Sequence, residues 1–147
     1  MRNFYKNQNG ITIVILLVTI AVIAILVGVT VTHLDTGTDI RNYNYMVADV
    51  QLLRDKILIY YNNTGTIPIT GNAFNAGETL GTQASNRDNN DYYLIDLNQL
   101  NNITLNYGGG TLENGDVYII NERSHEVYYL KGVVYEGETY YKPGIEV

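Results

Sequence analysis

The sequence predicts an α+β fold in which one long N-terminal helix packs on a small antiparallel β-sheet. Residues 11–32 form an apolar run without a charged side chain, long enough for a helix of about six turns. From Ile40 onward, apolar residues recur at three- and four-residue steps, which is the spacing of an amphipathic helix. The last third of the chain alternates short apolar runs with turn residues, and this pattern predicts strands and hairpins.

The composition indicates one small domain with an appendage. The chain has 147 residues and no cysteine, so disulfide bonds and cysteine-ligated metals are excluded. Residues 33–147 contain 7 basic and 15 acidic side chains, which gives a formal charge of −8. Because nucleic-acid phosphates attract basic surfaces, no nucleic-acid partner is expected.

Residues 11–34 are predicted to form the first, membrane-spanning half of the long helix. The 22 uncharged residues 11–32 would extend about 33 Å as a helix, close to the roughly 30 Å hydrocarbon thickness of a bilayer. This run is longer than the apolar core of a secretory signal peptide, so we expect a single-pass anchor in the cytoplasmic membrane. Arg2 and Lys6 precede the run, which places the N-terminus inside and the acidic remainder outside.

Small residues are spaced along this helix so that a second helix can approach it closely. Ala24 and Gly28 stand four residues apart, and Ala21 lies on the same face. The sequence therefore predicts a helix-packing stripe at Ala21, Ala24 and Gly28.

Residues 35–65 are predicted to form an amphipathic helix after a kink. Residues 35–38 contain Gly37 and three side chains that compete with helical hydrogen bonds, so a kink or a short melted turn is expected there. The buried face is predicted from the residues that recur at this spacing, which are Tyr43, Val47, Val50, Leu53, Ile57 and Tyr60 or Tyr61. Gly65, followed by a proline three residues later, is typical of a helix C-cap and a chain reversal.

The remainder is predicted to form a variable loop and then a sheet. Glycine and asparagine are frequent in residues 66–91, which indicates a long surface loop. Residues 92–147 are predicted to form an antiparallel β-sheet, with strands at residues 92–97, 116–121, 126–131, 133–135 and 139–141 and a further candidate at 100–107. In adjacent pairs such as Tyr128 and Tyr129, one ring is expected to face the helix and the other to be half exposed.

No catalytic, cofactor or metal site is predicted, and we do not expect an enzyme. His33 adjoins the apolar run and His125 lies in a hairpin loop, so the two do not suggest a shared metal site. Ser124 is next to His125, but adjacency in sequence does not produce the geometry of a catalytic triad. The loop near Asp88 offers oxygen ligands for calcium but lacks the glycine and distal glutamate of an EF-hand, so a solvated loop is expected.

The N-terminus resembles that of type IV pilins and type II secretion pseudopilins. The similarity lies in a short leader ending at Gly10, followed by Ile11 and an apolar helix. It implies that residues 1–10 are a leader removed by a prepilin peptidase after Gly10, that Ile11 becomes N-methylated, and that residues 11–34 pack into a filament core. The long helix and small sheet are also those of a pilin-like fold.

Ile15 occupies the position at which most members of that family carry a glutamate. In the family, this carboxylate is thought to neutralise the N-terminal amine of a neighbouring subunit during assembly. Subunits that lack it are typically minor ones at the filament tip. The resemblance therefore points to a minor or initiating subunit.

Two functions from different classes follow from the sequence. The first is a structural subunit of a type IV pilus or pseudopilus-like extracytoplasmic filament, and the missing glutamate indicates a minor subunit. Its partners would be other pilin subunits, a prepilin peptidase, an assembly platform with its ATPase, and membrane lipid. The second is a single-pass, membrane-anchored binding or adhesion module that is not cleaved. Cleavage after Gly10 distinguishes the two.

Overall fold

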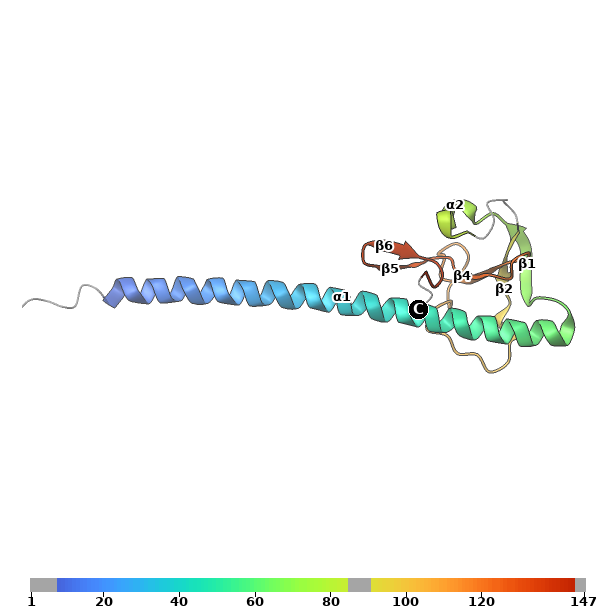
Figure 1. The fold of residues 1–147 in the computed structure, drawn as a ribbon, viewed down its shortest axis with the longest axis horizontal. Helices are drawn as coiled ribbons and strands as arrows, with labels where there is room; N and C mark the ends of the chain where they lie inside the picture. Colours follow the sequence, from blue (N-terminus) through green and yellow to red (C-terminus); the bar gives the residue numbers. More distant parts are fainter. Residues whose placement is uncertain (1–7, 85–90, 145–147) are drawn as a thin grey trace, which may run out of the picture. The chain divides into compact units, whose positions relative to one another are not determined.

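The computed structural model describes residues 8–84 and 91–144, with the side chains of residues 8–12 and 26–36 outside this description. The chain divides into two compact units, Met1–Thr38 and Asp39–Val147. One helix, α1 (Gln8–Thr64), includes most of the first unit and continues into the second (Figure 1). We call Asp39–Val147 the globular unit.

The backbone of α1 is helical at residues 35–38, where the sequence predicts a kink or a short melted turn. The melted turn is not formed, since the helical hydrogen bonds outweigh the cost of Gly37, about 1 kcal/mol relative to alanine. The helix ends as expected. Gly65 adopts a φ of 73°, and its N–H donates to the carbonyl of Tyr61 at 2.8 Å.

The globular unit contains a four-stranded antiparallel sheet and a separate hairpin. The sheet has the order β1-β2-β3-β4, with bounds β1 (Ile69–Phe74), β2 (Tyr92–Ile95), β3 (Tyr118–Asn121) and β4 (Val127–Tyr129). The hairpin consists of β5 (Val133–Tyr135) and β6 (Glu138–Tyr140). The α+β class, with a helix packed on an antiparallel sheet, is thereby confirmed, as are both C-terminal hairpins.

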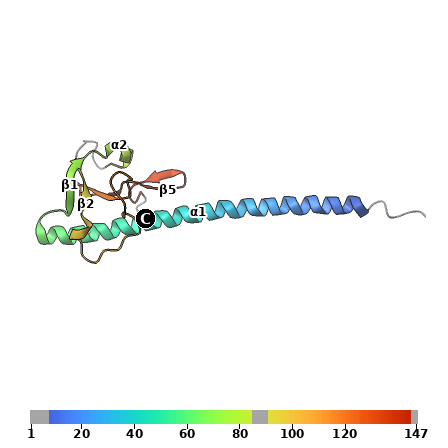
Figure 2. The same ribbon diagram turned by 180° about the vertical axis from the view of Figure 1, so that it is seen from behind.

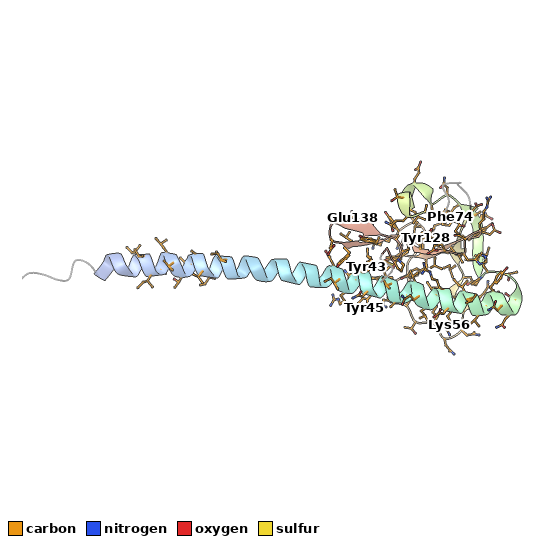
Figure 3. All side chains as sticks on the ribbon, in the orientation of Figure 1. Tyr43, Tyr45, Lys56, Phe74, Tyr128 and Glu138 are labelled. Carbon is orange, nitrogen blue, oxygen red and sulfur yellow. The ribbon has the colours of Figure 1, made fainter. Side chains whose placement is uncertain are left out.

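One core lies between α1 and the sheet. Met46, Val50 and Leu53 of α1 have no exposed surface, and they pack with residues such as Tyr118 and Ile120 of β3. Figure 3 shows Tyr43 directed toward the β5–β6 hairpin, where its ring packs on Tyr135 and Tyr140, and Tyr45 on the other side of the helix. The predicted buried face of the helix is confirmed for Tyr43, Val50, Leu53 and Ile57, which are buried in this core. Val47 and Tyr60 are partly buried against it, whereas Tyr61 is 40% exposed.

A second core covers the opposite face of the sheet. It contains Tyr92, Ile119 and Tyr128 under Leu80 of the short helix α2 (Gly77–Leu80). Figures 1 and 2 show α2 and α1 on opposite sides of the strands. Of the pair Tyr128 and Tyr129, Tyr129 belongs to the core that includes α1, so the half-exposed ring would be that of Tyr128. This expectation is wrong, because Tyr128 has no exposed surface.

The prediction of a variable loop at residues 66–91 is also wrong in part. This segment contains β1, α2 and the 3₁₀ turn η2 (Gly81–Gln83), while residues 85–90 lie outside the described part. The Gln83 amide donates to the Thr139 carbonyl at 2.7 Å and accepts from the N–H of Tyr141 at 2.9 Å. These bonds tie the segment to the end of the β5–β6 hairpin, and Leu80 packs it on the sheet. The candidate strand at 100–107 is irregular.

Candidate functional site

The first part of α1 presents a continuous apolar surface. Every side chain from residue 13 to residue 25 is exposed, and the large aliphatic ones are 49–66% exposed. Figure 3 shows side chains projecting outward along this part of the helix. Exposed apolar patches of this kind mark interaction surfaces. We call residues 13–25 the apolar helix surface.

The polar group within the apolar helix surface is satisfied inside the helix. The Thr19 hydroxyl donates to the carbonyls of Ile15, at 3.0 Å, and of Leu16, at 2.8 Å. A threonine in this arrangement presents no unpaired donor to an apolar environment. Among the described residues, no helix combines the length and the apolar character needed to cross a membrane.

The residues predicted for processing and helix packing all lie in α1. Gly10 and Ile11 fall in its first turns, where only the backbone is described. Ala21 and Ala24 are exposed on the apolar helix surface. Gly28 belongs to the helical backbone, but the side chains around it lie outside those described. The structure therefore leaves the packing prediction untested.

In the globular unit, a buried carboxylate joins α1 to a distant segment. Asp49 is 2% exposed and accepts from the backbone N–H of Asn106 and of Tyr107, both at 2.9 Å to Oδ2. It also accepts from the Asn106 side-chain amide at 2.9 Å and from the Tyr118 hydroxyl at 2.7 Å. These bonds fix the irregular segment 97–110 against the helix.

Three tyrosine rings stack next to this carboxylate. The ring centroids of Tyr107 and Tyr129 lie 5.1 Å apart, with an angle of 20° between the ring planes. The ring centroids of Tyr118 and Tyr129 also lie 5.1 Å apart, with an angle of 37° between the planes. Asp116 accepts from the Tyr129 hydroxyl at 2.8 Å and from the Gly108 N–H at 2.9 Å. Burial, followed by the hydrogen bond to Asp49, raises the pKa of Tyr118, and burial with the bond to Asp116 raises the pKa of Tyr129.

Two open cavities meet at Tyr107 and Asp116. The larger has a volume of about 720 Å³ and is lined by Asp116 and by ten residues of the segment 97–109, which do not include Gln99, Asn101 or Thr104. The smaller has a volume of about 350 Å³ and is bounded on its other side by Asp39 and Lys131. Both volumes are in the range of small-molecule pockets, about 300–1,000 Å³.

Sequence reasoning did not single out Asp49 or the cavities. One signal was available for Asp49, because it lies one turn from Met46 and Leu53 on the face of the helix that is otherwise apolar. A charged residue at such a position requires a buried partner. The cavities had no local signal, since they arise from an irregular segment.

The groups considered for catalysis or metal binding do not converge in the described part of the chain. The imidazole ring of His125 packs edge-on against the ring of Tyr61, with 5.0 Å between the ring centroids. The Ser124 hydroxyl accepts a hydrogen bond from the N–H of Glu126. The His33 side chain and Asp88 lie outside the described residues, and Asp91 pairs with Arg123 at 2.9 Å. Within the described residues, no three His, Asp or Glu side chains are grouped as a metal site.

Neither protein-family models nor curated proteins nor solved structures match this chain.

Proposed function

We propose that this chain is a minor structural subunit of an extracytoplasmic filament of the type IV pilus or pseudopilus kind. The observation that carries the proposal is the apolar helix surface, in which every side chain from residue 13 to residue 25 of α1 is exposed and all but Thr19 are aliphatic. Such a surface needs either lipid or neighbouring helices around it. A filament subunit uses both in turn.

Before assembly, residues 11–32 would lie in the cytoplasmic membrane, with the N-terminus inside and the globular unit outside. This part of the proposal is argued from the sequence, because side chains within this run lie outside those described. Assembly would then exchange lipid contacts for helix contacts along Ala21, Ala24 and Gly28, at little cost in apolar burial. Thr19 needs no partner in either state.

Processing would precede assembly. A prepilin peptidase would cut after Gly10, Ile11 would become the methylated N-terminus, and a platform with its ATPase would extract the subunit. Ile15 in place of a carboxylate favours insertion in the membrane, by up to roughly 3 kcal/mol at mid-membrane, and removes a charge pair from assembly. Easier insertion together with the missing charge pair supports a minor rather than a major subunit of the filament. No enzymatic activity is proposed.

The proposal is tested by the intact mass of the full chain purified from membranes of a host with an active prepilin peptidase. We expect a product that lacks residues 1–10 and carries one methyl group on Ile11. Gly10→Ala should abolish both changes, whereas Gln8→Ala, in the same leader, should leave both in place. An unprocessed native chain would exclude the filament subunit.

That negative result would support the second function, an uncleaved membrane-anchored binding module. The observation that favours this alternative is the pair of cavities at Tyr107 and Asp116. A filament subunit carries its contacts on α1, whereas a binding module requires a site in the globular unit.

A further inference from the structure

The larger cavity is preformed, because its wall is fixed at several points. Asp49 holds the backbone of Asn106 and Tyr107, and Asp116 holds that of Gly108. At the other end of the wall, the Tyr60 hydroxyl bonds the Gln99 side chain. A site held in this way loses little conformational entropy when a ligand binds.

The polar groups of the cavity suit a neutral ligand. No lysine or arginine is among the described residues that line it, so an anion would find no counter-charge there. The one carboxylate in the lining, Asp116, accepts from Gly108 and Tyr129, both through Oδ1. Asn98 and Asn102 also line the cavity, and in the described part of the chain neither side-chain amide is hydrogen-bonded. Each amide offers a donor and an acceptor, as a hydroxyl-bearing ligand requires.

The apolar groups of the cavity indicate that the ligand also has a C–H surface. Leu97, Leu105 and Tyr107 contribute to the lining. Tyr107 is the outermost ring of the three-ring stack, so Tyr129 supports it from one side. Burial and the nearby Asp49 carboxylate raise the pKa of Tyr107. The ring of Tyr107, rather than its hydroxyl, is the group offered to a ligand.

We propose that this cavity binds a neutral saccharide, with the C–H face of one sugar ring against Tyr107 and the ring hydroxyls bonded to Asn98 and Asn102. Sugars combine an apolar C–H face with hydroxyls that both donate and accept, and aromatic rings attract the positive edges of C–H groups. About 720 Å³ accommodates a mono- or disaccharide. The proposal does not depend on filament assembly, because it concerns the globular unit alone.

The test uses the full chain in phosphocholine detergent, since glycoside detergents would compete for the site. Saturation-transfer NMR is recorded with glucose, galactose, N-acetylglucosamine and their β1,4-linked disaccharides cellobiose, lactose and chitobiose, each offered separately. We expect saturation to be transferred from the protein to at least one of these sugars. The transfer should be strongest to the C–H protons on one face of a sugar ring.

Variants locate the site. Asn98→Ala and Asn102→Gly should each weaken binding about fivefold, the equivalent of one hydrogen bond. Glycine is chosen at Asn102 because its φ is 52°. Asn101→Ala is the matched control, since Asn101 is exposed in the same segment but does not line the cavity. Tyr107→Phe should keep binding within about twofold, and Tyr107→Ala should abolish it.

The outcomes separate clearly. Absence of saturation for all six probes with the native chain would overturn the proposal. So would binding that survives the combined Asn98→Ala and Asn102→Gly changes, because the two exposed side chains can be removed without disturbing the core. Binding of inorganic phosphate or glucuronic acid in preference to the neutral probes would contradict the assigned ligand class.

Discussion

The Asp49 carboxylate on α1 accepts a hydrogen bond from the Tyr118 hydroxyl on β3 at 2.7 Å, and both side chains are at most 2% exposed. This contact joins the helix to the centre of the sheet within the apolar core. No basic side chain bonds Asp49 in the described part of the chain. Its oxygens are satisfied by neutral donors instead, three of them from residues 106 and 107.

Asp49→Asn should destabilise the globular unit by about 2–4 kcal/mol. The amide keeps only one acceptor oxygen, and its NH₂ group would be placed against the N–H and O–H donors that now bond the second carboxylate oxygen. The free energy of unfolding is measured with urea, using the near-ultraviolet circular dichroism of the 14 tyrosines. Asp55→Asn, on the exposed side of the same helix, is the control and should change stability by less than about 0.5 kcal/mol. Equal effects of the two variants would exclude a special role for Asp49.

Stability should fall as the pH rises above about 10. The pKa of Tyr118 is raised in the folded chain from its ordinary value of 10.0, first by burial and then by the bond to Asp49. Between the two pKa values the unfolded chain loses this proton and the folded chain keeps it, so unfolding is favoured as pH increases. The stabilisation is complete below pH 10 and decreases above it.

This pH dependence is measured by urea unfolding at pH 8 to 11, followed by far-ultraviolet circular dichroism. Tyr118→Phe should reduce the slope, because the titrating group is gone. Tyr61→Phe, a change at an exposed tyrosine of α1, should leave the slope as it is. A slope unaltered by Tyr118→Phe would contradict the assignment.

The sequence predicts those parts of the fold that depend on local signals. The end of α1 follows from Gly65, and the buried face of the helix follows from the spacing of Val50, Leu53 and Ile57. The β1 strand gave no such signal. Its pairing with β2 is irregular between Thr70 and Phe74, and the intervening residues are exposed. Its strand character depends on β2, about twenty residues away.

The candidate site shows the same division. Asp49 stands out in the sequence as a charge on an apolar face, yet its partners lie 57 to 69 residues further along the chain. Their identity depends on how the segment 97–110 crosses the helix, which no periodic pattern encodes. The second core was missed for a similar reason, because α2 has only four residues.

Gly108→Ala should destabilise the globular unit by about 2–4 kcal/mol. Gly108 has a φ of 88°, and a Cβ atom there would lie 2.7 Å from Cδ2 of the buried Tyr118 ring. Strain in the backbone and the steric contact therefore add. Gly109→Ala is the matched control, since its Cβ would meet no atom within 4 Å and its φ is not in the left-handed region. Thermal unfolding of the two variants should differ by several degrees, and coincident curves would refute the prediction.

Helix association in the membrane should depend on the face that carries Ala24. Because the chain has no cysteine, Ala24→Cys introduces a single thiol, and we expect oxidation of membranes to yield disulfide-linked subunits. Val22→Cys is the control; it is exposed on the same helix but lies roughly opposite Ala24 on the helical wheel. Ala24→Leu should lower co-purification of differently tagged copies, because a larger side chain keeps the helices apart. Equal cross-linking at the two positions would show that the small-residue face does not direct the contact.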